Sequence, residues 1–199
     1  MSTGSGKPVS TDSNNAELKS TLLQIARDLV RTSGMTAFNL RVVAELANTS
    51  TQAIYTQFGG KSGLILALYK GWVVELEQRL LPLLATSTPI EMLLHTALIY
   101  REQASSDPEL FLSGSSPAAA EADILGMMFN SRVFTLFVSF LETGVKDGIF
   151  KPMASPERTA KALWAAVHGA VIFELSTRTP HEPVNSLNDL LPILLKGLG

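Results

Sequence analysis

Polar side chains recur on one side of a short stretch, residues 51–57. Gln52 carries an amide, and Thr51, Tyr55 and Thr56 carry hydroxyl groups. Helical spacing would turn the apolar residues among them inward: Ala53, Ile54 and Phe58. An amide can form paired hydrogen bonds with an adenine edge, and hydroxyl groups can bind bases or phosphates. These residue types predict contact with the major groove of DNA, although an ordinary exposed helix face would have the same spacing.

Residues that can bind phosphate or cap a helix flank this stretch. Lys61 falls in the first turn of the next predicted helix, where its charge and the free backbone N–H groups favour a phosphate. Asn39 begins an earlier helix and could act likewise, whereas Arg41 is equally compatible with a solvated surface arginine. The predicted DNA-contacting residues are Asn39, Arg41, Ser50, Thr51, Gln52, Tyr55, Thr56 and Lys61.

Two short helices must position these side chains. Apolar residues at positions i, i+3, i+4 and i+7 predict a helix over residues 40–47, and Ser50 or Thr49 can cap a second helix that ends at Gly59. A three-residue turn joins them. A helix over residues 16–33 precedes this pair and one over residues 61–81 follows it. The arrangement is typical of a helix-turn-helix.

The segment VAELANTSTQAIYTQFGGKSGL, residues 43–64, resembles the DNA-binding signature of TetR-family regulators. The matching positions are Ala44, Ala47, Ser50, Tyr55, Phe58, Lys61 and Leu64. Asn48 replaces the usual turn glycine, and asparagine tolerates left-handed backbone geometry. Gly63 replaces a better helix former and should weaken the start of its helix slightly. The resemblance implies a dimeric DNA-binding regulator, interpreted here as a ligand-responsive repressor of a near-palindromic operator, although the sequence does not separate a repressor from an activator.

The rest of the chain is also predicted to be helical. The expected segments are 90–104, 118–128, 130–146, 156–177 and 187–196, with loops at 107–108 and 113–117. The fold class is therefore all-α: an N-terminal three-helix DNA-binding domain with a helix-turn-helix, and a C-terminal helical ligand-binding and dimerisation domain. The predicted boundaries are a flexible tail at 1–14, the DNA-binding domain at 15–60 and the second domain at 61–199. The tail is either passive or an arm that touches DNA through Lys7.

A second resemblance lies in the segment LWAAVHG, residues 163–169, which is similar to a W-x-x-x-H-G motif of some C-terminal domains in this family. In those relatives the last two long helices form the dimer interface, which implies a homodimer through residues 156–177 and 187–196. Several small residues, which allow close helix contact, share one side of the first of these helices: Ala162, Ala165, Ala166, Gly169 and Ala170.

Aromatic and methionine residues are frequent in the C-terminal part. For any one of them plain core packing is an alternative, but together they suggest an apolar cavity for a small, largely apolar effector. The predicted pocket residues are Met92, His95, Met127, Phe134, Phe137, Trp164 and His168. The alternative function is a helical small-molecule-binding protein without a DNA-binding role.

The composition argues against other classes of protein. The 199 residues carry a net charge of −2 and include no cysteine, which excludes disulfides, zinc clusters and thiol catalysis. The chain contains no phosphate-binding glycine loop, no recognisable triad and no metal-type spacing of its histidines, so we expect no enzyme activity, metal or cofactor. Charges interrupt every apolar stretch and the N-terminal sequence lacks a secretory pattern, so we expect a cytoplasmic protein without a membrane segment.

Overall fold

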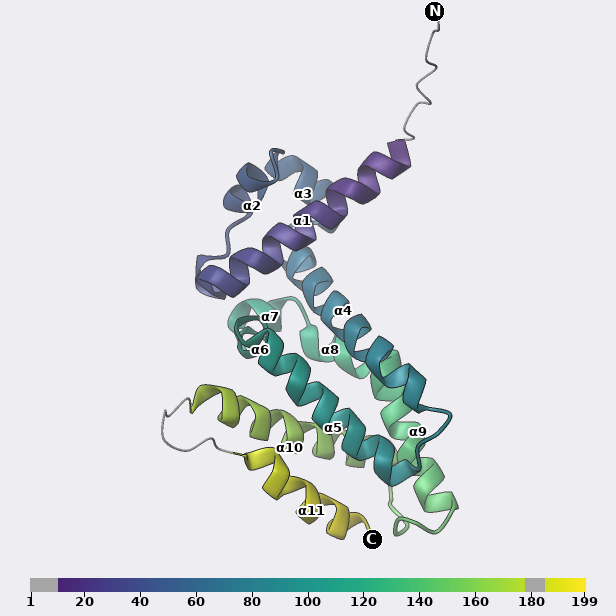
Figure 1. The fold of residues 1–199 in the computed structure, drawn as a ribbon. Coiled ribbons are helices and arrows are strands. Elements are labelled where there is room, and N and C mark those ends of the chain that lie inside the picture. Colours follow the sequence, from purple (N-terminus) through teal and green to yellow (C-terminus); the bar gives the residue numbers. More distant parts are fainter. Residues whose placement is uncertain (1–10, 178–184) are drawn as a thin grey trace, which may run out of the picture.

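The computed structural model describes residues 11–177 and 185–199. Within these residues the chain is helical, without strands, as predicted (Figure 1). The α-helices are α1 Thr11–Ser33, α2 Leu40–Leu46, α3 Thr51–Phe58, α4 Lys61–Leu80, α5 Pro89–Ser106, α6 Pro108–Ser113, α7 Pro117–Glu121, α8 Ile124–Phe129, α9 Arg132–Lys146, α10 Pro156–Ser176 and α11 Ser186–Leu198. Two short 3-10 helices, Met35–Ala37 and Leu81–Leu83, precede α2 and follow α4.

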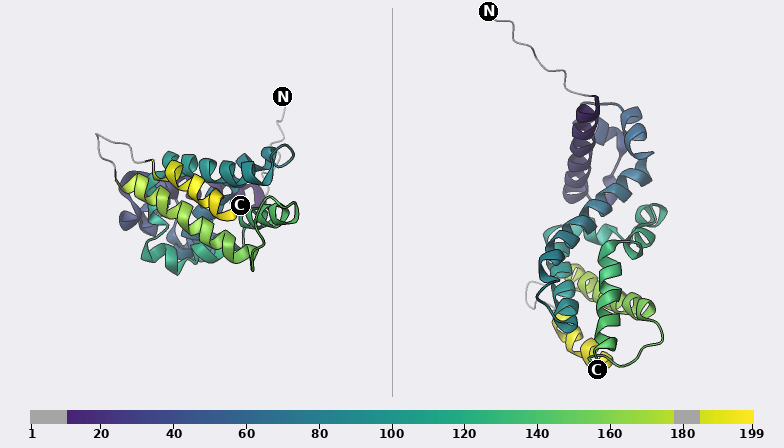
Figure 2. Two further views of the ribbon diagram at one scale, coloured as in Figure 1. Left: turned by 90° about the horizontal axis from the view of Figure 1, so that it is seen from below. Right: turned by 90° about the vertical axis from the view of Figure 1, so that its right-hand side faces the viewer.

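The helices form two parts that lie one above the other (Figure 2). Helices α1, α2 and α3 form the smaller part, which we call the head, and α5 to α11 form the larger part, the body. Helix α4 runs from the head into the body and contacts α1 and α3 as well as α5, α7, α8 and α9. A displacement of α4 would therefore change helix contacts in both parts.

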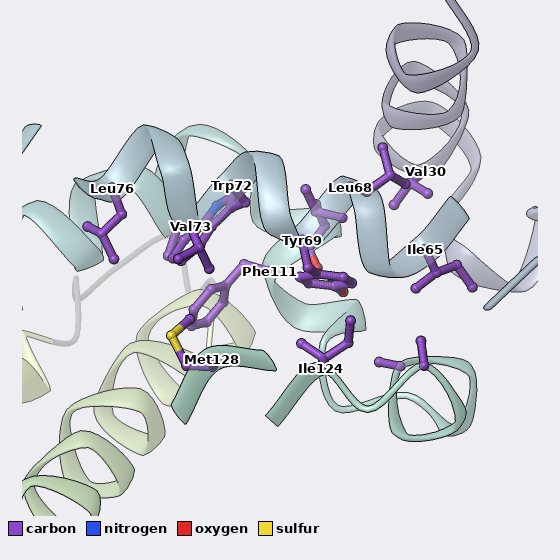
Figure 3. Packing of buried hydrophobic residues seen from close by; sticks show 14 of the residues in the cluster. Val30, Ile65, Leu68, Tyr69, Trp72, Val73, Leu76, Phe111, Ile124 and Met128 are labelled. Atoms are coloured by element: carbon purple, nitrogen blue, oxygen red, sulfur yellow. The ribbon is translucent and has the colours of Figure 1, made fainter. Parts of the chain in front are cut away.

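The amphipathic spacing of α4 explains its central place. Leu64, Leu68, Trp72, Leu76 and Leu80 recur every four residues and are all buried. Figure 3 shows that this stripe contacts both parts, with Leu68 beside Val30 of α1 and Trp72 close to Phe111 of α6. Burial of each such side chain contributes about 1.5–3 kcal/mol, so the apolar stripe fixes α4 against its neighbours.

Several boundaries differ from the sequence prediction. Helix α1 begins at Thr11 rather than near residue 16, because adding exposed turns to an already packed helix is favourable once the helix has nucleated. Residues 1–10, with the predicted arm residue Lys7, lie outside the described residues. The predicted loop region contains the short helix α6, which is introduced by Pro108 at its first position.

The predicted helix over 118–128 is interrupted at Asp123, which separates α7 from α8. Asp123 has a φ of 51°, in the left-handed region that ends a helix. Its carboxylate accepts a hydrogen bond of 3.2 Å from the backbone N–H of Gly126, which caps the start of α8.

No helix of the described residues is long and apolar enough to cross a lipid bilayer.

Candidate DNA-binding face and ligand cavity

Side-chain caps fix both helices of the helix-turn-helix. The Asn39 side chain accepts a hydrogen bond of 2.9 Å from the backbone N–H of Arg41 and begins α2. Ser50, rather than Thr49, caps α3 by accepting one of 3.2 Å from the backbone N–H of Ala53. Between the helices Asn48 adopts a φ of 49°, the left-handed conformation expected at this turn. The main chain of the turn is thus set by local hydrogen bonds.

Helix α3 has the two faces that the sequence predicts. Ile54 is fully buried, while Gln52 and Thr56 are exposed and the Tyr55 side chain is 53% exposed. Thr51 is only half-buried. The Thr56 hydroxyl donates its proton to the backbone carbonyl oxygen of Gln52 at 3.0 Å. Its oxygen can therefore still accept a hydrogen bond but has no proton left to donate. Gln52 offers both a donor and an acceptor on this exposed face.

The start of α4 lies directly after α3, where two glycines turn the chain. Gly59 and Gly60 both have positive φ, 75° and 119°. A side chain at Gly60 would approach the Tyr55 ring to 3.0 Å, so this glycine lets the ring pack on the backbone. Lys61 is exposed in the first turn of α4, and its ammonium group lies 5.8 Å from the centre of the Phe38 ring. The positive charge of Lys61 and the free N–H groups of this turn are therefore adjacent. Arg41, at the start of α2, is also exposed.

Gly63 has a different role from the one that the sequence suggests. A β-carbon at this position would collide with the backbone carbonyl oxygen of Phe58. The expectation that Gly63 merely weakens α4 is wrong, because the glycine permits the close approach of α4 to the end of α3. The helix-propensity argument fails here because it does not include this contact.

The body contains a cavity of about 510 Å³, within the range of small-molecule sites. It lies between α4, α5 and α10 on one side and the segment from α6 to α8 on the other. Figure 3 shows Phe111 of α6 beneath Trp72 and close to Met128 of α8. Leu125, at the rim, is 63% exposed, so the cavity reaches the surface of the chain.

One hydrogen-bonded pair marks the inner wall of this cavity. The Tyr100 hydroxyl of α5 lies 2.6 Å from Nδ1 of His168 of α10. Burial raises the pKa of Tyr100 and lowers the pKa of His168, so both groups are held in their neutral forms. Burial also raises the pKa of Tyr69 to about 12, and its hydroxyl donates to the Leu110 carbonyl oxygen at 2.8 Å.

The predicted pocket residues divide into two groups. Met127, Trp164 and His168 line the 510 Å³ cavity. The other four lie elsewhere: Met92 is fully buried in the main core, His95 faces Ser87, Phe134 belongs to a second core cluster, and Phe137 lines a separate apolar cavity beside α11. Helical periodicity identifies apolar residues but does not tell which of two neighbouring clusters each will join.

Several cavity residues were missing from the predicted set: Tyr69, Trp72, Phe111, Ile124 and Met128. Trp72 lies on the predicted apolar face of α4, which gives a signal for core packing but none for a cavity. Phe111 lies in the segment for which no helix was expected. These residues become neighbours only when α6 and α8 fold back on α4.

An ion-paired cluster joins the head to the body. Arg27 of α1 donates to Glu75 of α4 at 2.6 Å and 3.1 Å, and to Asp107 at 2.8 Å. Asp107 is buried between α5 and α6. The two carboxylates raise the pKa of the Arg27 guanidinium further, which keeps it charged. The body segment that carries Phe111 is thus tied to α1 as well as to α4.

The predicted dimer helices α10 and α11 pack on each other and leave apolar surface exposed. On α10, Ala162, Ala165 and Gly169 are exposed together with Phe173, at 53%, whereas Ala166 and Ala170 are half-buried. On α11, Ile193 is 67% exposed.

Outside residues 178–184 and the N-terminal ten, no group of three or more metal-ligating side chains is found.

Comparison with known proteins agrees with this architecture. Residues 22–68 match the family model of bacterial regulatory proteins of the tetR family. The uncharacterized HTH-type transcriptional regulator YhgD of Bacillus subtilis strain 168 is 24% identical over 185 residues, which cover 90% of this chain and 96% of YhgD.

Solved structures share the fold across both the head and the body. The transcriptional regulator FadR of Bacillus subtilis in complex with stearoyl-CoA has a TM-score of 0.71 and 15% identity, covering 90% of this chain and 99% of that one. The TetR-family repressor FadR of Thermus thermophilus in complex with lauroyl-CoA has a TM-score of 0.70 and 20% identity, covering 90% and 94%. Together these matches show that residues 22–68 resemble bacterial regulatory proteins of the tetR family and that the chain shares the fold of the two FadR proteins.

Proposed function

We propose that the protein is a ligand-responsive transcriptional repressor that binds a near-palindromic operator as a homodimer. One observation carries this proposal: α3 is anchored by the buried Ile54 and presents Gln52 and Tyr55 to solvent, beside the charged start of α4 at Lys61. A recognition helix needs an inner face that holds it and an outer face with hydrogen-bonding groups.

Within this face the residues divide by chemistry. Gln52 reads a base edge, because its amide can donate and accept at the same adenine. Tyr55, Lys61 and Arg41 bind phosphates and fix the orientation of α3, contacts that carry no sequence information. Asn39 and Ser50 act mainly as caps, since their side-chain oxygens already accept backbone hydrogen bonds. Thr51 and Thr56, which have shorter side chains, contact the DNA at the edge of α3.

Dimerisation through α10 and α11 would place two heads on one duplex. The exposed Phe173 and Ile193, together with the small residues of α10, give this surface the apolar character of a helix–helix interface. Two copies of α3 would then meet successive turns of one side of the DNA.

The effector site of this proposal is the 510 Å³ cavity of the body. Its walls include α4, whose other end carries Lys61 next to α3. An effector that binds one orientation of α4 better than another shifts the equilibrium between two spacings of the heads. The difference in affinity sets how far this equilibrium shifts. The acyl-CoA molecules in the two FadR structures support a ligand-binding role for a body of this shape.

Binding to DNA upstream of the coding sequence, measured by fluorescence anisotropy, tests the proposal. We expect Gln52→Ala to weaken operator binding by about 1–3 kcal/mol and to relax specificity at one base position per half-site. Gln78→Ala is the matched control, because Gln78 is also an exposed helical glutamine but lies far along α4 from the recognition helix. It should bind as the wild type does.

Two outcomes would contradict the proposal. Equal losses for Gln52→Ala and Gln78→Ala would remove the base-reading role of α3. Ligand binding by a protein that shows no affinity for any duplex would instead favour the alternative, a small-molecule-binding protein without a DNA-binding role.

A further inference from the structure

The inner and outer walls of the 510 Å³ cavity differ in chemistry. The inner wall is aromatic, with Tyr100 at its centre: its ring centre lies 5.4 Å from Trp72, 5.5 Å from Phe111 and 4.7 Å from Trp164, in edge-to-face arrangements. The outer wall consists mainly of small residues, aliphatic residues and methionines of the segment from Gly114 to Met128, with Asp123 at its rim. An aromatic molecule inserted from the rim would meet ring edges and faces that prefer this geometry.

The Tyr100–His168 pair leaves hydrogen-bonding capacity in the cavity wall. If the Tyr100 hydroxyl donates to Nδ1 of His168, then Nε2 of the imidazole carries the remaining proton. If Nδ1 donates instead, the Tyr100 hydroxyl keeps its own proton for another acceptor. Either tautomer leaves one donor and one acceptor on the pair, and both residues line the cavity. A ligand oxygen placed there would gain a hydrogen bond.

The charges around the cavity restrict the ligand further. Among the described residues that line it, Asp123 is the one that is formally charged, and it lies at the exposed rim. Of the lining residues in the described part of the chain, none is a lysine or arginine that could compensate an anion, so a buried carboxylate would lose its hydration without gaining a partner charge. The interior therefore suits an uncharged molecule.

Building on the ligand site of the proposed function, we propose that the effector is an uncharged aromatic molecule with one oxygen function, and that the Tyr100–His168 pair determines this specificity. The aromatic part occupies the space against Trp72, Phe111 and Trp164. The oxygen, a ketone or a phenol, binds the donor that the pair leaves free. The far end of the molecule points to the rim at Leu125.

Three naphthalene derivatives of nearly the same shape separate the contributions of the aromatic part, the oxygen and the charge to the binding affinity, measured by isothermal calorimetry of the full chain. The ketone 2-acetylnaphthalene should bind roughly fivefold to tenfold tighter than 2-isopropylnaphthalene, which lacks the oxygen. The carboxylate 2-naphthoate should bind at least about tenfold more weakly than the ketone. Equal affinity for all three, preference for the carboxylate, or lauroyl-CoA binding tighter than every naphthalene would overturn the proposal.

Variants assign the preference to the pair. Both variants keep a ring: Tyr100→Phe removes the hydroxyl group, and His168→Phe removes both ring nitrogens. Each should therefore reduce the advantage of the ketone over the hydrocarbon to less than about twofold while hydrocarbon binding stays unchanged. Tyr69→Phe is the matched control, because Tyr69 lines the same cavity but its hydroxyl is committed to Leu110 and Ser113. It should keep the preference. If Tyr100→Phe weakens both ligands equally, the pair has only a structural role and the inference fails.

Failure here is distinguishable from failure of the proposed function. Calorimetry of the chain alone needs no DNA, and operator binding by the unliganded chain needs no effector. Sequence-specific DNA binding without the ketone preference refutes this inference alone. The ketone preference in a chain that binds no operator leaves the inference standing and refutes the repressor.

Discussion

In the head, polar side chains lie on the surface and apolar ones fill the interior, whereas the body encloses several polar groups. Leu22, Val30 and Ile54 form part of the head core, and Gln52 and Thr56 stand outside it. The body buries three polar or charged residues, Thr96, Gln103 and Asp107, in addition to the Tyr100–His168 pair. The apolar interior holds the helices of the head together, which suits a part that presents a fixed surface.

Some buried polar atoms of the body and of α4 have no hydrogen-bond partner within the described part of the protein. These atoms are Nε1 of Trp72, Oε1 of Gln103 and Oδ1 of Asp107. A buried polar group that also lacks a water partner costs about 1–3 kcal/mol of stability. Trp72 lines the cavity, and Asp107 binds the arginine that links the head, so these atoms lie between the ligand site and the head. A rearrangement there loses fewer satisfied contacts than one within the head, which suits a region that must respond to a ligand.

The largest effect that we predict breaks the contact between α3 and α4. Gly63→Ala should destabilise the protein by about 3 kcal/mol or more, because the added methyl group collides with the Phe58 carbonyl oxygen and backbone must move. Gly71→Ala is the control in the same helix. Its side chain would meet nothing within 4 Å, so it should stabilise the protein by about 0.5–1 kcal/mol. Urea unfolding measures both, and changes of the same sign would contradict the contact.

The next prediction concerns the ion-paired cluster that joins the two parts. Arg27→Met should cost about 2–3 kcal/mol, because the Asp107 side chain, 5% exposed, would stay buried without its cation. Arg31→Met removes an arginine one turn further along α1 whose pair with Asp28 is exposed, and should change stability by less than about 0.5 kcal/mol.

A double variant separates the buried charge from the packing of the arginine. Asp107→Asn combined with Arg27→Met should be less destabilised than the sum of the two single changes, since the neutral side chain needs no cation. Additive losses, or equal losses for Arg27→Met and Arg31→Met, would show that the cluster does not hold the head to the body.

The contrast between head and body also explains how much the sequence could predict. In the head, Asn39 and Ser50 accept hydrogen bonds from backbone N–H groups within a few residues, and Asn48 adopts the left-handed conformation itself. Their residue types therefore predict the caps and the turn that the structure contains. Gly63 was misjudged because its partner, the Phe58 carbonyl oxygen, matters only through the angle between two helices.

The cavity was harder to predict because its residues come from distant segments. Trp164 and His168 were identified, but Phe111 and Ile124 join them only through the folding of α6 to α8, which the sequence interpretation had partly assigned to loops. Phe134 and Phe137 have the same composition signal and lie in a different cluster. Periodicity shows which face of a helix is buried, and tertiary packing decides against what.

The smallest effect that we predict concerns the pH dependence of the body. Burial lowers the pKa of His168 in the folded protein, whereas the unfolded chain should titrate near about 6.5. Below that pH the unfolded state binds a proton that the folded state takes up only at lower pH. The stability contribution of the neutral imidazole is therefore complete above about pH 6.5 and declines as the pH falls through this value toward the lowered pKa.

The variant His168→Phe isolates this contribution. Subtracting its free energy of unfolding from that of the wild type cancels the titration of all other groups that the substitution leaves unchanged. We expect the difference to be constant from about pH 8 to 7 and then to shift against the wild type between about pH 6.5 and 5. Parallel curves over the whole range would mean that His168 has the same proton affinity in both states. The inner wall of the cavity would then be as hydrated as the surface of the head, and the contrast between the two parts would not extend to this pair.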